Sequence, residues 1–500
     1  MPPRVPITPR ARPNRMRLIA AAVSAALALG LTGCATPRLQ STVDVPAEFT
    51  AASVVVVAEP EVAWWESYGD PVLSDLIARA ARENRDIRIA VERVRAARAG
   101  ETISRSALLP NIGAVANASN TSNSYSGSAR QAVPETRSGS GGLSVSWEID
   151  LTGRLRAGAA AAAAEAQASE DQARGMRLLV LSDVASNYFT LVGAQRQLDT
   201  VRAISAAQTE TLRLVSARER AGLASSFDVE RARTEASRAL AAIPPLETLV
   251  AVSRHRLSVL IGSQPSAAAA LVPWTGVVAV PEVRPGQPAA LLERRPDLLA
   301  LSKQLDAANW RRQAAAAEWF PRLFVSALFG RENVEVNGLS LGSARFGNVA
   351  GLLAMPLLDW GRTRSINEIA ESAQSEALLR YENGIVRALE DVENGLVALR
   401  DERDRARVLS SAADSAQAAL KHAESLYKRG QIDLLPLLDA QRARLAVQVS
   451  ANDSQTQLLL DSVQLFKALG GGWQAFEPTA TDAGRPAASQ IPTSTNKESS

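Results

Sequence analysis

The sequence predicts a mainly helical protein with a small β part, and it predicts that this arrangement is built twice along the chain. Three observations support this fold class: long alanine-rich segments without proline, four short segments with strand character, and an internal repeat. Of the 500 residues, 46% are hydrophobic but only 4% are aromatic. That mixture suits long, closely packed helices better than the core of a compact enzyme.

The internal repeat is visible as two blocks of matching sequence. Residues 84–110 resemble residues 295–321, and Asp86 and Asp297 each lie 24 residues before the proline that ends the block. The two blocks are 211 residues apart. A repeat of this size indicates two copies of one structural unit.

Beyond these blocks the offset becomes 208 residues and stays at that value. Gly153 then matches Gly361, and Gly222 matches Gly430. A register held over this distance is not expected from chance similarity between alanine-rich helices. The predicted organisation is a signal peptide at 1–33, a lipidated segment at 34–69, repeat copies at 70–263 and 290–472, a proline-rich linker at 264–289 and a disordered tail at 473–500.

Each copy is predicted to run helix, β-hairpin, very long helix, break, helix. The hairpins are expected at about 110–150 and 321–359, the long helices at about 154–220 and 362–428, and the following helices at about 226–262 and 434–469. A helix over 154–220 would be roughly 100 Å long at about 1.5 Å per residue. Helices of this length need neighbours along most of their surface.

The strand prediction is clearest at Leu143–Asp150, where apolar and polar residues alternate strictly. The serine-, glycine- and asparagine-rich stretch 120–142 before it reads as a loop. Further strands are expected near 110–119, 321–330 and 348–359, and about ten residues is the length of a transmembrane β-strand. Four strands cannot close a membrane barrel, so other subunits must complete the sheet if it lies in a membrane.

The long helices carry a heptad pattern. Val184, Leu191, Leu198 and Leu212 share one heptad position, with Ser205 between them, and the second copy repeats the pattern. This spacing predicts supercoiled packing against neighbouring helices. An ordinary soluble coiled coil fits the helices equally well, so the strands and the N-terminus must discriminate.

The N-terminus has the pattern of a lipoprotein signal. Arg17 and the apolar run Leu18–Leu31 precede Cys34, and "LTGC" resembles a bacterial lipobox, with Met1 or Met16 as the start. Lipidation of Cys34 would anchor the chain, and Ala35 favours the outer membrane. An ordinary cleaved signal with an incidental cysteine is the alternative.

Several classes of function are not supported. A formal charge of +3 with scattered basic residues does not suggest nucleic-acid binding. Cys34 is the single cysteine, and His255 and His422 stand apart, so we expect no metal site. Ser425–Lys428 fits a Ser-x-x-Lys pattern without its companion motifs, and no phosphate loop or dinucleotide motif occurs. We therefore expect no enzyme and no cofactor.

The motifs together resemble a bacterial outer membrane factor, the TolC-like family, and specifically its NodT-type efflux lipoproteins. The stretches that carry the resemblance are Trp64–Ile77, Asp86–Pro110, Glu293–Ala300, Ala317–Leu323, Pro356–Arg362, Arg387–Leu399, Leu437–Arg442 and Leu465–Trp473. The resemblance implies a homotrimer in which each chain gives four strands to a twelve-stranded barrel, continued by a periplasmic α-helical barrel. It further implies a periplasmic adaptor, an inner-membrane pump of the RND type, and passive efflux of drugs, toxic compounds or metals.

The resemblance also implies functional residues at the two helix-turn-helix joints. Adaptor-docking tips are expected at four residues, Gly222, Leu223, Gly430 and Gln431, and an acidic tip position at Asp228. A pore gate is expected at Leu435 and Asp439, three copies of each in a trimer. The alternative for Asp439 is a solvated carboxylate near a helix N-terminus. Ile432 and Pro436 depart from the TolC pattern, which leaves the closing contacts open.

Local physics accounts for the second joint. Gly430 can adopt the left-handed conformation that ends a helix, Asp433 can cap the next helix, and Pro436 falls in its first turn. At the first joint Ser225 and Asp228 have the spacing of a capping box. A ring of Asp439 carboxylates would attract cations, so we expect closure to respond to pH and divalent cations.

Two other functions stay open from the sequence. One is the outer-membrane duct of a type I protein-secretion system, which belongs to the same family. The other is a structural envelope lipoprotein that uses the helices as a scaffold, against which the alternating strand and the paired hairpins argue.

Overall fold

The computed structural model describes residues 37–51, 62–276 and 278–477. The signal peptide and Cys34 lie outside these residues. The chain divides into two compact units, and each unit contains parts of both repeat copies. The first unit comprises residues 37–42, Arg93–Ser169 and Ala300–Asn383, and the second comprises residues 43–92, Glu170–Leu299 and the chain from Gly384 onward, as far as these are described.

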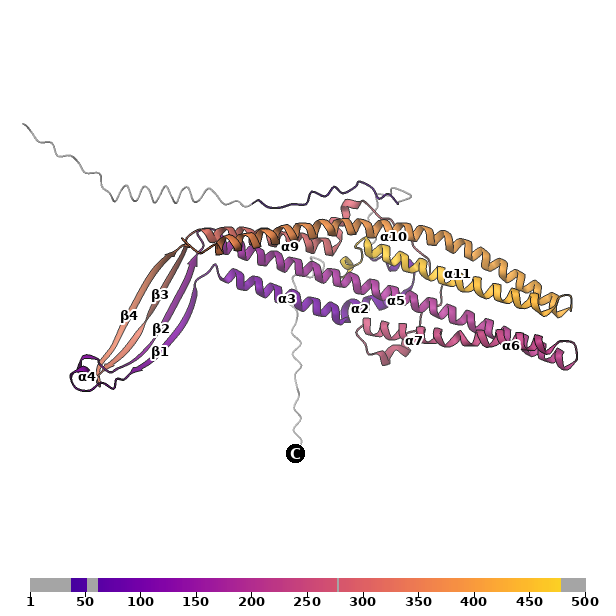
Figure 1. The fold of residues 1–500 in the computed structure, drawn as a ribbon, viewed down its shortest axis with the longest axis horizontal. Coiled ribbons are helices and arrows are strands. Elements are labelled where there is room, and N and C mark those ends of the chain that lie inside the picture. The colour runs from indigo at the N-terminus through magenta and orange to yellow at the C-terminus, as the bar shows by residue number, and fades with distance from the viewer. Residues whose placement is uncertain (1–36, 52–61, 277, 478–500) are drawn as a thin grey trace, which may run out of the picture. The chain divides into compact units, whose positions relative to one another are not determined.

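The first unit contains a single antiparallel sheet in which sequential strands are neighbours (Figure 1). Its strands are β1 (Asn111–Thr121), β2 (Thr136–Ile149), β3 (Arg322–Val336) and β4 (Leu339–Ala354), and the short helix α4 (Ser128–Ala132) lies between β1 and β2. Pairing of β2 with β3 joins the two repeat copies, for example at Leu143 opposite Phe329.

The strands are longer than the sequence predicted. Residues 136–142, expected to be loop, belong to β2, because pairing with both neighbours satisfies their backbone groups whatever the side chains. In the second copy the expected loop is a two-residue turn at Asn337 and Gly338, with φ of 50° and 81°, as a tight hairpin requires. β4 ends at Ala354, so residues 355–359 are not strand.

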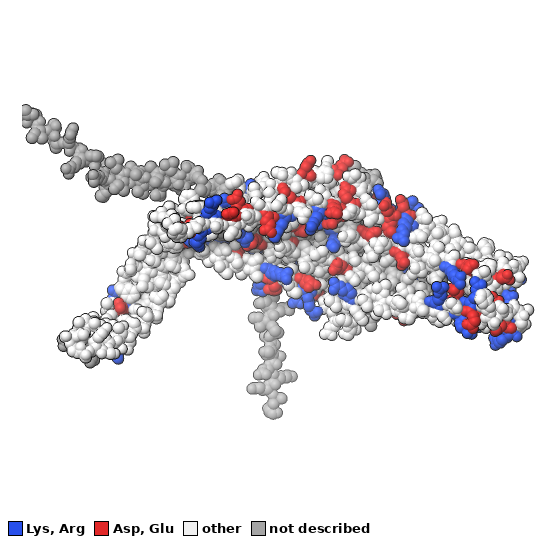
Figure 2. All heavy atoms as spheres, viewed as in Figure 1, with Lys and Arg blue, Asp and Glu red and all other residues white. Residues whose placement is uncertain are grey.

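One face of the sheet collects apolar side chains. Ile112, Leu143, Phe329, Val349 and Leu353 lie on this face by register and are all more than half exposed. The strands in Figure 2 show few charged atoms, whereas groups of charged atoms are scattered over the helices. An exposed apolar face of this kind indicates a surface that is covered by a membrane or by another protein.

Two helices of 67 residues each dominate the chain, α5 (Arg154–Arg220) and α10 (Arg362–Lys428). The heptad residues Val184, Leu191 and Leu198 are at most 3% exposed. Both helices are followed by a turn and a returning helix, which for α10 is α11 (Leu434–Ala468). The predicted interruption of the helix pattern is therefore a hairpin in each copy.

The returning helix of the first copy corrects the sequence prediction of one helix over 226–262. It is divided into α6 (Ser226–Ala241) and α7 (Ile243–Leu260), with the break at Ala242. Pro244 and Pro245 follow the break, and proline in a helix interior would remove a hydrogen bond and clash with the preceding turn. A new helix start accommodates both prolines at its beginning.

The second unit has an aromatic core beneath the motif Trp64–Ile77. Trp64 stacks on Phe466 at 5.3 Å between ring centroids, and Tyr68 lies 4.9 Å from Phe189. Asp70 caps α2 (Pro71–Glu83) by accepting from two backbone amides and also accepts from the hydroxyl of Tyr188 at 2.6 Å. The motif therefore fixes the start of one helix against α5 and α11.

The other helices are α3 (Arg85–Ser106), α8 (Leu291–Arg294) and α9 (Pro296–Ala316), with 3₁₀ turns at Glu66–Tyr68, Pro265–Ala270, Pro288–Ala290, Ala317–Trp319 and Trp473–Phe476. The last turn corrects the start of the predicted disordered tail, 473–500, whereas residues 478–500 lie outside the described residues. Trp473 is 6% exposed, and its indole donates to the carbonyl of Arg294 at 3.0 Å. Within the described residues, none of the helices combines the length and apolarity needed to cross a membrane.

Candidate functional site at the hairpin tips

The first tip is a turn closed by its own backbone. Gly222 has φ of 72°, its amide donates to Glu219, and the amide of Leu223 donates to Arg218, both at 2.8 Å. These two bonds are a Schellman motif, which a left-handed glycine completes. Leu223 is 70% exposed, so the tip presents an apolar side chain to a partner or to water.

The side chain at the acidic tip position, Asp228, hydrogen-bonds to the neighbouring residue Ser225. Its carboxylate accepts from the backbone amide of Ser225 at 3.2 Å and from the Ser225 hydroxyl at 2.8 Å, and the Asp228 amide donates back to that hydroxyl. The predicted capping box is therefore present. It fixes the first turn of α6 directly behind the tip.

The second tip repeats the same backbone turn. Gly430 has φ of 71°, its amide donates to Tyr427 at 3.0 Å, and the amide of Gln431 donates to Leu426 at 2.9 Å. Asp433 stands at the N-cap of α11, but its side chain makes no capping hydrogen bond, so that prediction is wrong in its chemistry. Without that bond, Asp433 leaves the start of α11 less firmly fixed than α6.

The two predicted gate residues share one face of α11. Leu434, Leu437 and Leu438 are buried in the cluster that joins the two hairpins, whereas Leu435 is 41% exposed and the Asp439 side chain 59% exposed. Residues four apart lie one above the other on a helix. The structure thus brings an apolar and an acidic side chain together on an uncovered face, one turn apart.

A residue that sequence reasoning missed connects this face to the first hairpin. Arg442 lies 3.3 Å from Asp439 and 2.6 Å from Glu235 of α6. Glu235 is 6% exposed as a residue, and the hydrogen bond from Arg442 lowers the pKa of its carboxyl. The i,i+3 spacing from Asp439 was readable in the sequence, but Glu235, 207 residues away, was not.

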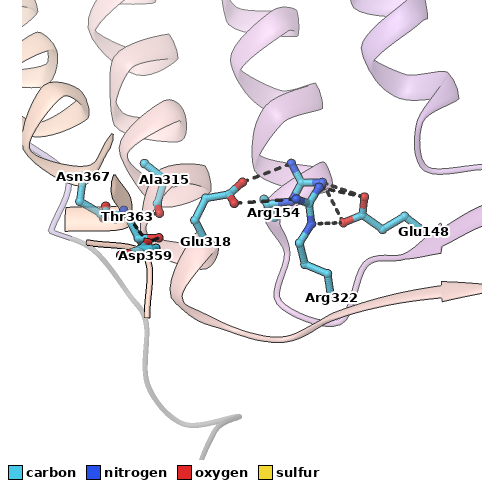
Figure 3. A network of polar contacts seen from close by, with 8 residues as sticks. All are labelled: Glu148, Arg154, Ala315, Glu318, Arg322, Asp359, Thr363 and Asn367. Atoms are coloured by element: carbon cyan, nitrogen blue, oxygen red, sulfur yellow. Dashed lines mark hydrogen bonds and ion pairs between the residues drawn. The ribbon is translucent and has the colours of Figure 1, made fainter. Parts of the chain in front are cut away.

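The strand-to-helix joint of the first unit holds a second polar cluster, drawn in Figure 3. The carboxylate of Glu148 accepts from Arg154 at 2.8 and 2.9 Å and from Arg322 at 3.1 and 3.2 Å. Glu318 lies 3.6 Å from Arg154 and 3.9 Å from Arg322. Two acids and two arginines balance one another, which ties β2 and β3 to the start of α5.

The same joint shows how α10 begins. Asp359 accepts from the backbone amide of Thr363 at 2.8 Å (Figure 3). It also accepts from the backbone amide of Gly361 at 3.1 Å. Gly361 has φ of 92°, which only glycine adopts readily. The motif Pro356–Arg362 therefore encodes the connection that follows β4 and the cap of a long helix.

No group of three or more potential metal ligands occurs among the residues that the structure describes. Cys34, the predicted lipidation site, lies before the first described residue. The candidate functional residues within the described chain thus lie in two turns, on one exposed helix face and in two ion-pair clusters.

These features define a class of protein. Within the described residues β1 and β4 are paired on one side only, the sheet has an uncovered apolar face, and two long helical hairpins end in exposed turns. Such a chain is typical of a subunit of an envelope channel whose sheet is completed by further chains.

Comparison with known proteins gives the family. A family model described as outer membrane efflux protein matches residues 76–263 and 288–471, and the chain belongs to this family. The outer membrane protein OprJ of Pseudomonas aeruginosa is 32% identical over 419 residues, covering 82% of this chain and 86% of OprJ. The probable outer membrane lipoprotein SilC of Salmonella typhimurium is 27% identical over 418 residues, covering 83% and 88%.

A solved structure agrees with this assignment. The MtrE outer membrane channel of Neisseria gonorrhoeae, determined in its open state, superposes with a TM-score of 0.78 at 26% identity, covering 88% of this chain and 98% of MtrE. The predicted family and fold class are therefore confirmed. The chain is an outer-membrane efflux channel protein.

Proposed function

We propose that three copies of this chain assemble into one channel, in which each copy contributes four strands to a twelve-stranded barrel and two hairpins to a periplasmic α-helical barrel. The observation that carries the proposal is the sheet. Among the residues that the structure describes, each of its edge strands, β1 and β4, pairs with one neighbour, and its apolar face is uncovered, with Ile112 68% exposed. In lipid each unpaired backbone group costs several kcal/mol, so the edges require partner strands.

The channel passively conducts drugs, toxic compounds or metals from a periplasmic adaptor and an inner-membrane pump of the RND type. The adaptor docks on the tips, at Gly222 and Leu223 of the first hairpin and Gly430 and Gln431 of the second. Two Schellman turns and the capping box at Asp228 support this role, because they give the partner rigid surfaces of defined shape.

The pore is narrowed by a ring of Leu435 followed by a ring of Asp439. Their common exposed face on α11 supports this proposal. Three carboxylates on one axis attract cations, and the Arg442 guanidinium beside each of them limits the net charge. Closure then responds to pH and to divalent cations.

Lipidation of Cys34 anchors the chain in the outer membrane. Supporting this are the apolar run, the "LTGC" stretch and the likeness to a relative named as a probable lipoprotein. Mass spectrometry of the mature N-terminus tests it, since a lipidated Cys34 adds the mass of its acyl groups and a Cys34→Ala variant lacks them.

Single-channel recording in planar bilayers tests the channel and its gate together. We expect native protein to give discrete conductance steps that divalent cations block from the tip side. Asp439→Asn should relieve that block, whereas Asp433→Asn, which removes the same charge from an exposed side chain without a capping bond, should not. A protein without conductance would instead be a structural lipoprotein, and equal block in both variants would remove Asp439 from the gate.

Efflux and protein secretion differ in what cells lose. Deletion of this chain should increase susceptibility to small toxic compounds, and the native chain should restore resistance. A type I secretion duct would instead leave susceptibility unchanged and abolish export of a protein.

A further inference from the structure

The described N-terminal residues are bound by side chains of α9 and α10 through their main chain. Asn309 accepts from the amide of Leu39 at 3.1 Å and donates to the carbonyl of the same residue at 3.3 Å. Gln374 donates to the carbonyl of Pro37 at 3.2 Å and to Asn309 Oδ1 at 2.7 Å. A side-chain amide that gives and receives one bond each imitates the pairing of a neighbouring strand.

Burial makes these contacts specific. Asn309 is 6% exposed and Gln374 is 5% exposed. If the segment left the site, both side-chain amides would lose their hydrogen bonds to its backbone, which is costly for buried polar groups. The side chain of Arg38 adds a cation–π contact, with its guanidinium 4.0 Å from the ring centroid of Trp310.

Carboxylates continue the same mode of binding further along the segment. In the first unit Glu382 accepts from the amide of Thr42 at 3.3 Å. In the second unit Glu393 accepts from the amides of Thr50 and Ala51 at 2.6 and 2.9 Å, beside the buried Phe49. The side-chain oxygens of Asn309, Glu382 and Glu393 all accept hydrogen bonds from backbone amides, which almost any extended sequence can donate.

The internal repeat provides a comparison within the molecule. At the offsets of 211 and 208 residues, four positions in the first copy correspond to Asn309, Gln374, Glu382 and Glu393, and they hold Arg98, Ala166, Arg174 and Ala185. Ala166 and Ala185 are fully buried, and Arg174 pairs instead with Asp171 and Glu477, each at 2.6 Å. At these four positions the amides and carboxylates that bind the segment thus have no counterpart in the first copy.

We propose that Asn309 and Gln374 form a main-chain clamp, a binding site in the second repeat copy that holds residues 37–42 of this chain, as an extended segment, in one register. The clamp recognises backbone groups rather than side chains. Pro37 is the third residue after Cys34, and a chain of that length spans at most about 10 Å. If Cys34 is lipidated, which rests on the proposed function, the clamp also fixes where the anchor is tethered.

Hydrogen–deuterium exchange of the full chain in detergent tests the clamp. The variant Asn309→Leu with Gln374→Met preserves side-chain volume and removes the amides, and we expect residues 39–42 to exchange on the order of tenfold faster. Arg98→Ala, at the position in the first copy that corresponds to Asn309, should leave that exchange unchanged. Peptides from α5 report whether the fold is kept, and if they also exchange faster, the single Gln374→Met variant replaces the double one.

Two substitutions in the segment separate backbone from side-chain recognition. Leu39→Pro removes the amide that Asn309 accepts from, so residues 40–42 should exchange faster, whereas Leu39→Ala keeps the amide and should not change them. Unchanged exchange in the clamp variant, or an equal rise with Leu39→Ala, would overturn the proposal. In Cys34→Ala the protection should persist, so failure of the clamp and absence of the lipid are distinguishable.

Discussion

At the scale of single residues, Arg442 links the candidate gate to the first hairpin. It is the cation for Asp439, on its own helix, and for Glu235, on α6. The Glu235 side chain is only 8% exposed, whereas the Asp439 side chain is 59% exposed. Because water solvates Glu235 poorly, its carboxylate needs the charge of Arg442 more than the carboxylate of Asp439 does. Removing the arginine therefore leaves a nearly buried carboxylate with weaker compensation, chiefly Arg238 at 3.8 Å.

We expect Arg442→Gln to lower the free energy of unfolding by about 1–2 kcal/mol, less than for a fully buried pair because Arg442 is itself partly exposed. Arg233→Gln is the matched control, since Arg233 pairs with a well-exposed Glu230 and should cost at most about 0.5 kcal/mol. Urea unfolding of both variants measures the difference. Equal effects would mean that the Glu235 pair does not stabilise the hairpins.

The same pair should give stability a defined pH dependence. Arg442 holds the pKa of Glu235 below its ordinary value of 4.5, so the folded state binds that proton less readily than the unfolded state. The contribution is therefore complete above about pH 4.5 and is lost as pH falls through the lowered pKa. Native protein and Glu235→Gln should differ in unfolding free energy at pH 7 and converge in strong acid.

Sequence reasoning could place the turns of the site but not its ion pairs. Gly222 and Gly430 predict turns with a left-handed backbone conformation, because few residues other than glycine adopt a positive φ. Asp433 has the right type and place for a cap, yet whether a carboxylate reaches the backbone depends on its rotamer, which composition does not encode. The partner of Arg442 comes from another hairpin, so only the packed structure reveals it.

At the scale of elements, α11 is held close to both long helices by glycines. A side chain at Gly193 of α5 would overlap Thr456 of α11, and one at Gly395 of α10 would meet the Leu465 side chain at 3.1 Å. Glycine in a helix costs about 1 kcal/mol relative to alanine. The close approach it permits is what these positions gain in return.

We expect Gly193→Ala to destabilise the protein by roughly 1–3 kcal/mol because of the overlap with Thr456. Gly175→Ala in the same helix should instead stabilise it by up to about 1 kcal/mol, since its nearest neighbour would be 3.7 Å away. Thermal unfolding of both variants, and of Gly193→Ala with Thr456→Ala, checks the mechanism. If the second substitution gives no rescue, the cost does not come from this contact.

The elements also show where sequence patterns stop being informative. The lack of proline over 154–220 indicated one long helix, and α5 has those bounds, because nothing interrupts its hydrogen bonds. Residues 136–142 carry no apolar alternation, so their place in β2 follows from pairing with β1 and β3 and not from their own side chains. Long-range pairing of this kind overrides local propensity.

At the scale of the whole molecule, the sheet determines what the chain needs from its surroundings. The apolar face needs lipid to cover it. The unpaired backbone groups of the outer strands need further strands to pair with them. Neighbouring positions of β2 alternate between the apolar and the opposite face, as Leu143 and Ser144 do through their partners Phe329 and Leu328. A pair of charge substitutions in one strand can therefore separate membrane insertion from conduction.

We expect Leu143→Arg to impair insertion and assembly, because an arginine on the lipid face costs about 2–4 kcal/mol near the middle of the bilayer. Ser146→Arg, three residues along β2 and on the opposite face, should insert normally and shift the ion selectivity of the channel towards anions. Membrane fractionation with native mass spectrometry measures assembly, and bilayer recordings measure selectivity. If Ser146→Arg fails to insert while Leu143→Arg inserts, the lipid face is the opposite one, and the assignment of the pore side must be reversed.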